Sequence, residues 1–170
     1  PSQTAVLSQV EDIWGNSDVI VIRAPVGSGK SAIAVTIAKL STQGEHTASI
    51  LTHRVSLQDQ YRKSFPDIPA IMGKARYTCP TMKMSCGDVK EALDGYCSGS
   101  CKFTVDKELA EASKVSIYNY HVYAHLPVKR NVIVCDEYHS IFDILSEMLT
   151  LRLWKHKDKY PADLQTAGDV

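Results

Sequence analysis

Two short stretches of the sequence carry residue types that could bind and hydrolyse a nucleoside triphosphate. The first is a glycine-rich loop that reads Ala-Pro-Val-Gly-Ser-Gly-Lys-Ser. Its glycines allow backbone N–H groups to turn toward phosphates, Lys30 can reach the β- and γ-phosphates, and the Ser31 hydroxyl can ligate Mg²⁺. The predicted nucleotide-binding residues are Ala24, Pro25, Val26, Gly27, Ser28, Gly29, Lys30 and Ser31.

The second stretch, Asp-Glu-Tyr-His, directly follows the apolar run Val132–Cys135. In a parallel sheet such a strand would deliver its acidic residues to the same edge as the phosphate loop. Asp136 would then hold Mg²⁺, directly or through water, and Glu137 would orient and deprotonate the attacking water. His139 could link hydrolysis to motion. The alternative for these residues is an exposed acidic turn.

Four cysteines lie between the two stretches, separated by six, ten and three residues, and they are Cys79, Cys86, Cys97 and Cys101. Four thiolates can hold a structural zinc ion or an iron–sulfur cluster. Zinc ribbons typically contain close C-x-x-C pairs, and the absence of such pairs slightly disfavours zinc. Because the surrounding segment is rich in glycine and weakly periodic, we expect a small metal-dependent fold there. The alternative is a chance set of thiols.

The elements that must position these residues follow from apolar periodicity. Short β-branched runs predict buried strands, and four-residue spacing of apolar residues predicts amphipathic helices. The predicted strands are Val19–Ile22, Ala48–Thr52, Val115–Tyr118 and Val132–Cys135. The predicted helices are Thr4–Trp14, Gly29–Leu40, Arg54–Phe65 and Val105–Ser113, with another after His139. Alternating strands and helices predict an α/β fold with a parallel sheet.

Composition restricts the class of protein further. The net charge is zero, so the chain does not bind nucleic acid by composition alone, although residues 54–90 carry a local net charge of +4 that could face phosphates. No apolar run approaches the roughly 20 residues that span a bilayer, and no signal-peptide pattern is present at the start. We therefore expect an intracellular protein, in the cytoplasm, nucleoid or nucleus, with no membrane partner. The first residue is Pro1, which suggests trimming or a piece of a longer protein.

Taken together, the motifs resemble those of superfamily 2 helicases. Ala-x-x-Gly-x-Gly-Lys-Ser followed by Asp-Glu-x-His is similar to motifs I and II, and the intervening cysteines look like the iron–sulfur subgroup typified by XPD and DinG. Gln3 resembles the upstream glutamine that contacts adenine. Leu51-Thr-His-Arg54 is similar to motif Ia, Gly73–Cys79 to the segment that leads into the cluster, and Val115–His121 to the strand that ends in Asn-His or Asn-Tyr.

This resemblance implies ATP and Mg²⁺ as cofactors and a [4Fe–4S] cluster on the four cysteines, with Zn²⁺ as the alternative. It also implies single-stranded or forked DNA as a partner. The residues that would contact DNA are Thr52, His53, Arg54, Lys74, Arg76, Tyr77 and Asn119. Such helicases need a second RecA-like domain, which the remaining sequence does not supply. The cysteine spacing differs from that of the subgroup, and Tyr138 replaces a more frequent alanine.

We therefore expect a RecA-like P-loop NTPase domain, the first motor domain of an ATP-dependent DNA helicase, with an inserted four-cysteine subdomain. The predicted boundaries are 1–72 and 113–140 for the motor domain, 73–112 for the insertion, and 141–170 for a helix and the start of an arch-type insertion. A rival hypothesis is a metal-stabilised DNA-binding or regulatory module whose ATP site does not hydrolyse. A nucleotide kinase fits less well, because it has no use for motif Ia or the cysteines.

Overall fold

The computed structural model describes residues 2–92, 101–126 and 130–149, and it divides the chain into two compact units, Pro1–His139 and Ser140–Val170. In the first unit the helices are α1 (Gln3–Ile13), α2 (Lys30–Leu40), α3 (Val55–Ser64), α4 (Cys86–Ala92), α5 (Lys102–Ala112) and α6 (Tyr120–Ala124). The strands are β1 (Ala48–Thr52), β2 (Ala70–Ile71), β3 (Val115–Asn119) and β4 (Val132–Cys135). Short 3₁₀ turns cover Lys74–Arg76 and Tyr138–Ser140. In the second unit, α7 spans Ile141–Leu149.

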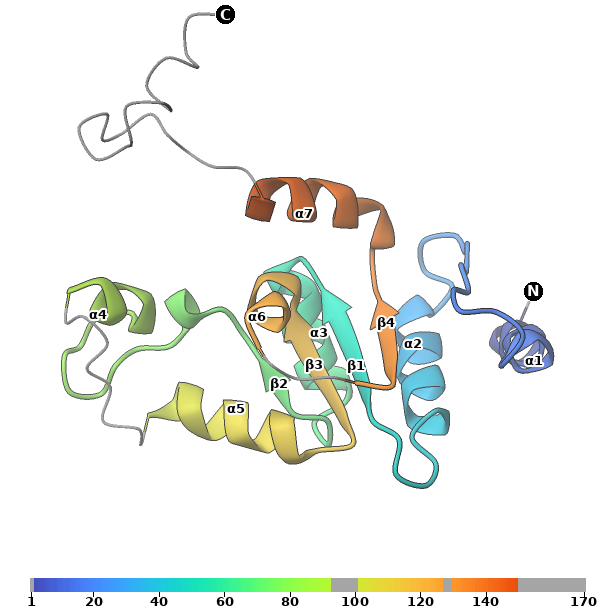
Figure 1. The fold of residues 1–170 in the computed structure, drawn as a ribbon, viewed down its shortest axis with the longest axis horizontal. Helices are drawn as coiled ribbons and strands as arrows, with labels where there is room; N and C mark the ends of the chain where they lie inside the picture. Colours follow the sequence, from blue (N-terminus) through green and yellow to red (C-terminus); the bar gives the residue numbers. More distant parts are fainter. Residues whose placement is uncertain (1, 93–100, 127–129, 150–170) are drawn as a thin grey trace, which may run out of the picture. The chain divides into compact units, whose positions relative to one another are not determined.

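Within the described ranges, the strands form one parallel sheet in the order β2-β3-β1-β4 (Figure 1). The central strand β1 is buried along its whole length and pairs with β3 on one side and β4 on the other. Thr52 is opposite Asn119, and Leu51 is opposite Cys135. The carboxyl ends of β1, β3 and β4 therefore meet at one edge of the sheet, where ligands bind in open α/β folds.

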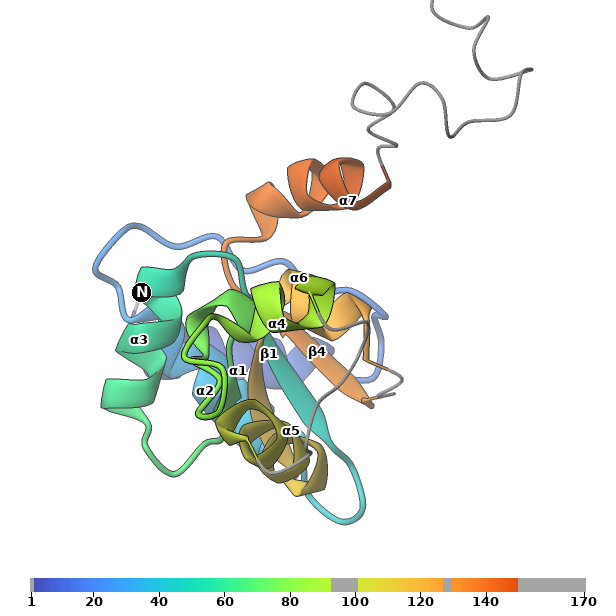
Figure 2. The same cartoon turned by 90° about the vertical axis from the view of Figure 1, so that its left-hand side faces the viewer.

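The two faces of the sheet are covered by different helices. Ile50 and Ile117 pack with Val35 of α2 and Tyr61 of α3 in the main apolar core. On the other face, the Ser116 hydroxyl donates to the Ala110 carbonyl of α5, and Tyr118 packs against Tyr123 of α6. Alternate residues of β3 thus face opposite layers, as the period of a strand requires. Figure 2 shows α2 and α3 together on one side of the strands.

The predicted strand Val19–Ile22 is not part of this sheet, and the expectation that both its faces are buried is wrong. Ile20 and Ile22 pack against a second apolar cluster that contains Val10 of α1 and Ile33 and Ile37 of α2. Val19 and Val21 point away from it and are 77% and 61% exposed. The segment is therefore packed on one side only, and β4 is the neighbouring edge of the described sheet.

The cysteine-bearing segment adds short elements to one end of the sheet. Thr78 and Ser85 form an antiparallel bridge, which is followed by α4 and, after the undescribed residues 93–100, by α5. The sequence did not predict α4, and α5 begins three residues earlier than predicted. In the described residues, no helix is long and apolar enough to cross a membrane.

Candidate active site

The phosphate loop lies between the extended segment 19–23 and the start of α2. Gly27 and Gly29 have φ angles of 80° and 81°, in the left-handed region that favours glycine. Gly29 is the residue that caps α2, so the positive end of the helix dipole and its first free N–H groups lie at the loop. Lys30 Nζ donates to the carbonyl oxygens of Ala24, at 3.3 Å, and Pro25, at 3.1 Å. The loop thus has the backbone form and the cation that a phosphate site requires.

Gln3 lies against the same loop, although it is far from it in the sequence. Its Nε2 donates a hydrogen bond to the Ser28 carbonyl oxygen at 3.3 Å. The same amide nitrogen also occupies the space that a Cβ at Gly29 would need. The structure therefore places Gln3 beside the phosphate loop, as a residue that could reach the nucleotide.

Asp136 directly follows β4 and is held in place by hydrogen bonds on several sides. Its backbone N–H donates to the Leu51 carbonyl at 2.9 Å, which continues the pairing of β4 with β1. Its Oδ1 accepts from the Glu137 N–H at 3.0 Å, and its Oδ2 accepts from the Tyr61 hydroxyl at 2.8 Å. The Tyr120 hydroxyl donates to its carbonyl oxygen at 3.1 Å. The carboxylate is thus fixed at the carboxyl edge of the sheet.

Glu137 adopts a left-handed conformation, with φ at 57°. A non-glycine residue in this region is uncommon and is often found at functional sites. Its Oε2 lies 3.3 Å from Nε2 of the exposed His139. The two side chains therefore form one polar pair beside Asp136, and Glu137 is positioned as a candidate base.

Tyr61 lies beside both predicted magnesium ligands. Its hydroxyl donates to Asp136 Oδ2 at 2.8 Å, and the Ser31 side chain lies next to it. Burial, and secondarily the Asp136 carboxylate, raises the pKa of the Tyr61 hydroxyl far above its usual value, so it remains protonated. Ser31 and Asp136 supply a hydroxyl and a carboxylate oxygen, which are the donors that Mg²⁺ prefers, and they therefore fit this ion.

Sequence reasoning missed Tyr61 and Tyr120 as members of the site. Tyr61 lies within the predicted helix of residues 54–65, and its ring packs in the core. Tyr120 is 8% exposed, and burial, followed by the neighbouring Cys135, raises its pKa well above the usual value. The signal that could have identified them is that a buried tyrosine needs a partner for its hydroxyl. The sequence does not reveal that Asp136 is this partner.

Three of the predicted DNA contacts lie together at the ends of β1 and β3. Thr52 is fully buried, and Asn119 Nδ2 donates to the His53 carbonyl at 3.2 Å while its Oδ1 caps α6. These two polar side chains are therefore part of the internal packing at this edge of the sheet. Arg54, which caps the start of α3, is exposed and is free of this packing.

The remaining residues predicted to contact DNA differ in how deeply their side chains are buried. Arg76 is half exposed and lies 3.4 Å from Asp59, and the Lys74 ammonium lies over the Phe103 ring at 5.2 Å from its centroid. Tyr77 is only 4% exposed, packs edge-on against Phe103, and donates to Asp106 at 3.1 Å. Burial raises its pKa to about 12. The expectation that Tyr77 stacks on a base does not agree with this burial.

The described cysteines do not form a metal site by themselves. Cys79 donates its N–H to Met84 and Cys86 donates to Tyr77, so the two occupy diagonal positions of one short ladder. Cys101 is buried and caps the start of α5. Among the described residues no three potential ligands are close enough to hold a metal ion. Cys97, the fourth predicted ligand, lies outside these residues.

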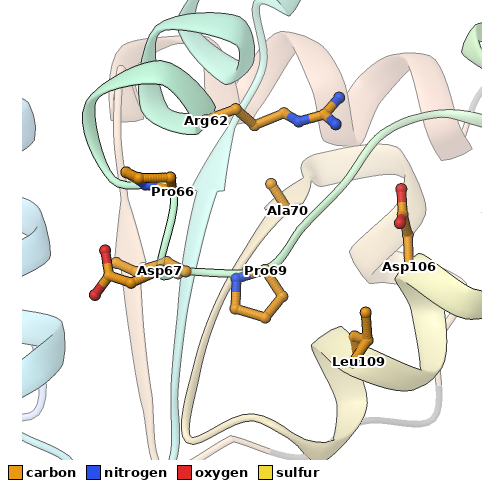
Figure 3. Close-up of a pocket in the computed structure, with 8 residues that line it drawn as sticks. Arg62, Pro66, Asp67, Pro69, Ala70, Asp106 and Leu109 are labelled. Carbon is orange, nitrogen blue, oxygen red and sulfur yellow. The ribbon is translucent and has the colours of Figure 1, made fainter.

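A cavity of about 320 Å³ lies between α3, the turn at 66–70 and α5 (Figure 3). Its lining includes Arg62, Pro69, Asp106 and Leu109. It shares no residue with the phosphate loop or with Asp136, so it belongs to a different part of the domain.

Comparison with known proteins decides the family. The profile of the ResIII family, described as "Type III restriction enzyme, res subunit", matches residues 1–156. The chain belongs to this family. No curated protein and no solved structure gave a significant match. As a ResIII member, the chain carries a superfamily 2 helicase-type ATPase motor domain, and the chemistry of that domain is ATP hydrolysis that depends on nucleic acid. The four-strand parallel sheet is the α/β architecture expected of such a domain.

Proposed function

We propose that this ResIII chain is the first motor domain of a DNA helicase, with ATP bound over Gly27–Ser31. The observation that carries the proposal is the placement of Ser31 and Asp136 beside the same Tyr61 hydroxyl, which donates to Asp136 Oδ2 at 2.8 Å. These residues are 105 positions apart in the sequence. Their meeting at the carboxyl edge of a parallel sheet is the arrangement needed to hold a metal ion beside a triphosphate.

Each residue has a separate role in the proposed hydrolysis. The N–H groups at the start of α2 and the Lys30 ammonium bind the phosphate oxygens and stabilise the charge that develops on them. Ser31 and Asp136 would hold Mg²⁺, which when bound neutralises phosphate charge. Glu137 orients the water and accepts its proton, and His139 is the neighbouring group that can receive or release that proton. Gln3 contacts the loop from the side on which the base would lie.

The finer part of the proposal concerns DNA and a second motor domain. Arg54, Lys74 and Arg76 are cations from separate segments that could bind phosphates of a single strand. A second RecA-like domain, in the same or another chain, would supply the other wall of the ATP site. Hydrolysis would then open and close the two domains and move them along single-stranded or forked DNA.

The cysteines carry a further hypothesis within this proposal, namely ligation of a [4Fe–4S] cluster as in the XPD and DinG group. It is supported by the ladder that joins Cys79 and Cys86, and it requires Cys97 and Cys101 to complete the ligand set. The test is a visible spectrum with iron and sulfide analysis of anaerobically purified protein. Broad absorbance near the violet end of the visible spectrum, together with iron, would support the cluster. A colourless protein with zinc would favour the alternative metal.

The experiment that tests the ATPase proposal compares two lysines of the same helix. Lys30→Ala removes the cation of the loop, whereas Lys39→Ala removes an exposed cation whose partner is Asp67. We expect Lys30→Ala to lose ATP binding and DNA-dependent turnover, and Lys39→Ala to keep both, since exposed ion pairs contribute little to stability. ATP binding without turnover in the wild-type chain and its full-length protein would favour the non-hydrolysing regulatory module instead.

A further inference from the structure

The Tyr61 hydroxyl lies against the carboxylate that the proposed function assigns to Mg²⁺. It donates to Asp136 Oδ2 at 2.8 Å, and the Ser31 side chain lies beside it. The other carboxylate oxygen, Oδ1, accepts from the Glu137 N–H at 3.0 Å. Both oxygens of Asp136 are therefore engaged, and Oδ2 is engaged by Tyr61.

A metal ion and the hydroxyl would draw on the charge of the same carboxylate. Mg²⁺ binds oxygens at about 2.0–2.1 Å in near-ideal octahedral geometry. A carboxylate oxygen has two lone pairs, so an ion on Asp136 Oδ2 would share that oxygen with the Tyr61 hydrogen bond, and each interaction would weaken the other. A hydrogen bond to a carboxylate is stronger than one between neutral groups, so its weakening opposes metal binding measurably.

The Tyr61 ring is held so that only its hydroxyl can respond. The side chain is 1% exposed and packs with Val35, Ala38 and Ile117 in the main core, and its ring lies 6.0 Å from that of Phe65. A close-packed ring does not withdraw without leaving a cavity. The phenolic O–H can rotate about its C–O bond, however, and direct its proton to another acceptor.

We propose that Tyr61 is a positioning residue that competes with Mg²⁺ for the charge of Asp136 and so sets the metal affinity of the nucleotide site. This inference rests on the proposed function, because it takes Asp136 as a metal ligand. The hydrogen bond from the hydroxyl and the metal draw on the same carboxylate oxygen, so each weakens the other. Removal of the hydroxyl alone should therefore strengthen metal binding while the core remains packed.

The test uses Mn²⁺ as a paramagnetic substitute for Mg²⁺ and measures binding rather than turnover. Free Mn²⁺ is followed by electron paramagnetic resonance in the presence of ADP, for the 170-residue wild-type chain and Tyr61→Phe. We expect Tyr61→Phe to bind Mn²⁺ about tenfold more tightly, the factor that corresponds to the loss of one competing hydrogen bond to a carboxylate. Affinity for ADP without metal should remain unchanged.

Tyr118→Phe is the matched control, since it also removes the hydroxyl of a fully buried tyrosine. That hydroxyl accepts from Arg130 at 3.4 Å, away from Asp136, so we expect wild-type Mn²⁺ affinity. Thermal unfolding of both variants reports the loss of stability separately. A wild-type chain that binds no Mn²⁺–ADP would overturn the proposed function itself. Mn²⁺ binding that is equal or weaker in Tyr61→Phe would overturn only the competition by Tyr61.

A second measurement keeps the inference testable if Tyr61→Phe does not fold. Protein labelled with 3-fluorotyrosine is titrated with Mg²⁺–ADP and observed by ¹⁹F NMR in the Tyr120→Phe background, so that Tyr120 cannot account for a change. We expect one buried tyrosine resonance to shift as metal binding weakens the hydrogen bond of its hydroxyl to Asp136. Resonances that all remain in place while Mg²⁺–ADP binds would contradict the competition.

Discussion

The Gln3 side chain reaches from the first turn of α1 to the phosphate loop, where its Nε2 donates to the Ser28 carbonyl oxygen at 3.3 Å. The same nitrogen fills the space beside Gly29 that any other residue would need for its Cβ. Gly29 also has a φ of 81°, so two separate constraints act on this glycine. One is local backbone strain, and the other is contact with a residue 26 positions earlier.

We predict that Gly29→Ala destabilises the domain by more than backbone strain alone. A left-handed conformation costs a non-glycine residue roughly 1–2 kcal/mol, and the Cβ would in addition displace Gln3. Gly44→Ala is the control, because Gly44 has a φ of 68° and no atom lies within 4 Å of the position that an alanine Cβ would take there. Urea unfolding of both variants should show the larger loss for Gly29→Ala. If Gln3→Ala does not reduce the difference, Gln3 is not its cause.

The second prediction concerns Glu137 as the base. Glu137→Gln keeps the shape of the side chain and the demand for a left-handed backbone, and it removes the proton acceptor. We expect the rate of ATP cleavage in single turnover with DNA to fall by about 10²–10⁴-fold, the usual contribution of a general base. Nucleotide affinity should stay within about twofold, because the side chain is not assigned to the phosphates.

The control for this substitution is Glu111→Gln, on α5, where the Glu111 carboxylate forms a surface ion pair with Lys107. It should hydrolyse ATP at the wild-type rate. Unchanged cleavage in Glu137→Gln would remove Glu137 from the mechanism and leave the orientation of the water to another group.

Local sequence signals predicted the elements that are fixed by their own composition. The bounds of β1 and β4 follow directly from short apolar β-branched runs, and α2 follows from the glycines and apolar spacing of residues 29–40. The segment Val19–Ile22 differs from β4 only in its last residue but is not in the described sheet. Composition indicates that a strand is possible, whereas pairing depends on a partner strand elsewhere in the chain.

The candidate site shows the same division between local and long-range information. The phosphate loop and Asp136 could be predicted because each carries its chemistry in a few adjacent residues. Tyr61 could not, because its role comes from Asp136, 75 positions later. For Tyr77, the basic surroundings suggested exposure, but the ring is buried against Phe103 because its hydroxyl finds both the Met72 N–H and Asp106.

The third prediction concerns Arg130, whose guanidinium completes the end of α5. Its Nη1 donates to the Ser113 carbonyl and its Nη2 to the Ala110 carbonyl, both at 2.7 Å. Free carbonyls at a helix C-terminus need such donors, and a cation there also complements the helix dipole. We expect Arg130→Gln to lower the free energy of unfolding by about 2–3 kcal/mol. Lys107→Gln, which breaks an exposed pair on the same helix, should cost about 0.5 kcal/mol or less.

Circular dichroism during urea unfolding measures both Arg130→Gln and Lys107→Gln. Equal losses for the two variants would mean that the carbonyls of α5 are satisfied by water, and that Arg130 contributes no more than a surface charge.

The last prediction tests the nucleic-acid surface through Arg54 and Tyr77. Arg54 is exposed at the start of α3, so a phosphate contact would be lost in Arg54→Ala. We expect weaker binding of a fluorescent single strand, with the slope of log K against log salt reduced by about 0.7, the value for one phosphate contact on single-stranded nucleic acid.

Tyr77→Phe removes hydrogen bonds from a buried side chain, so it should lower stability and leave DNA affinity unchanged. Lys107→Ala, which removes a cation from α5, is the charge-matched control. An unchanged slope in Arg54→Ala would place the phosphate contacts elsewhere, and a loss of affinity in folded Tyr77→Phe would mean that this tyrosine leaves its buried position to meet the DNA.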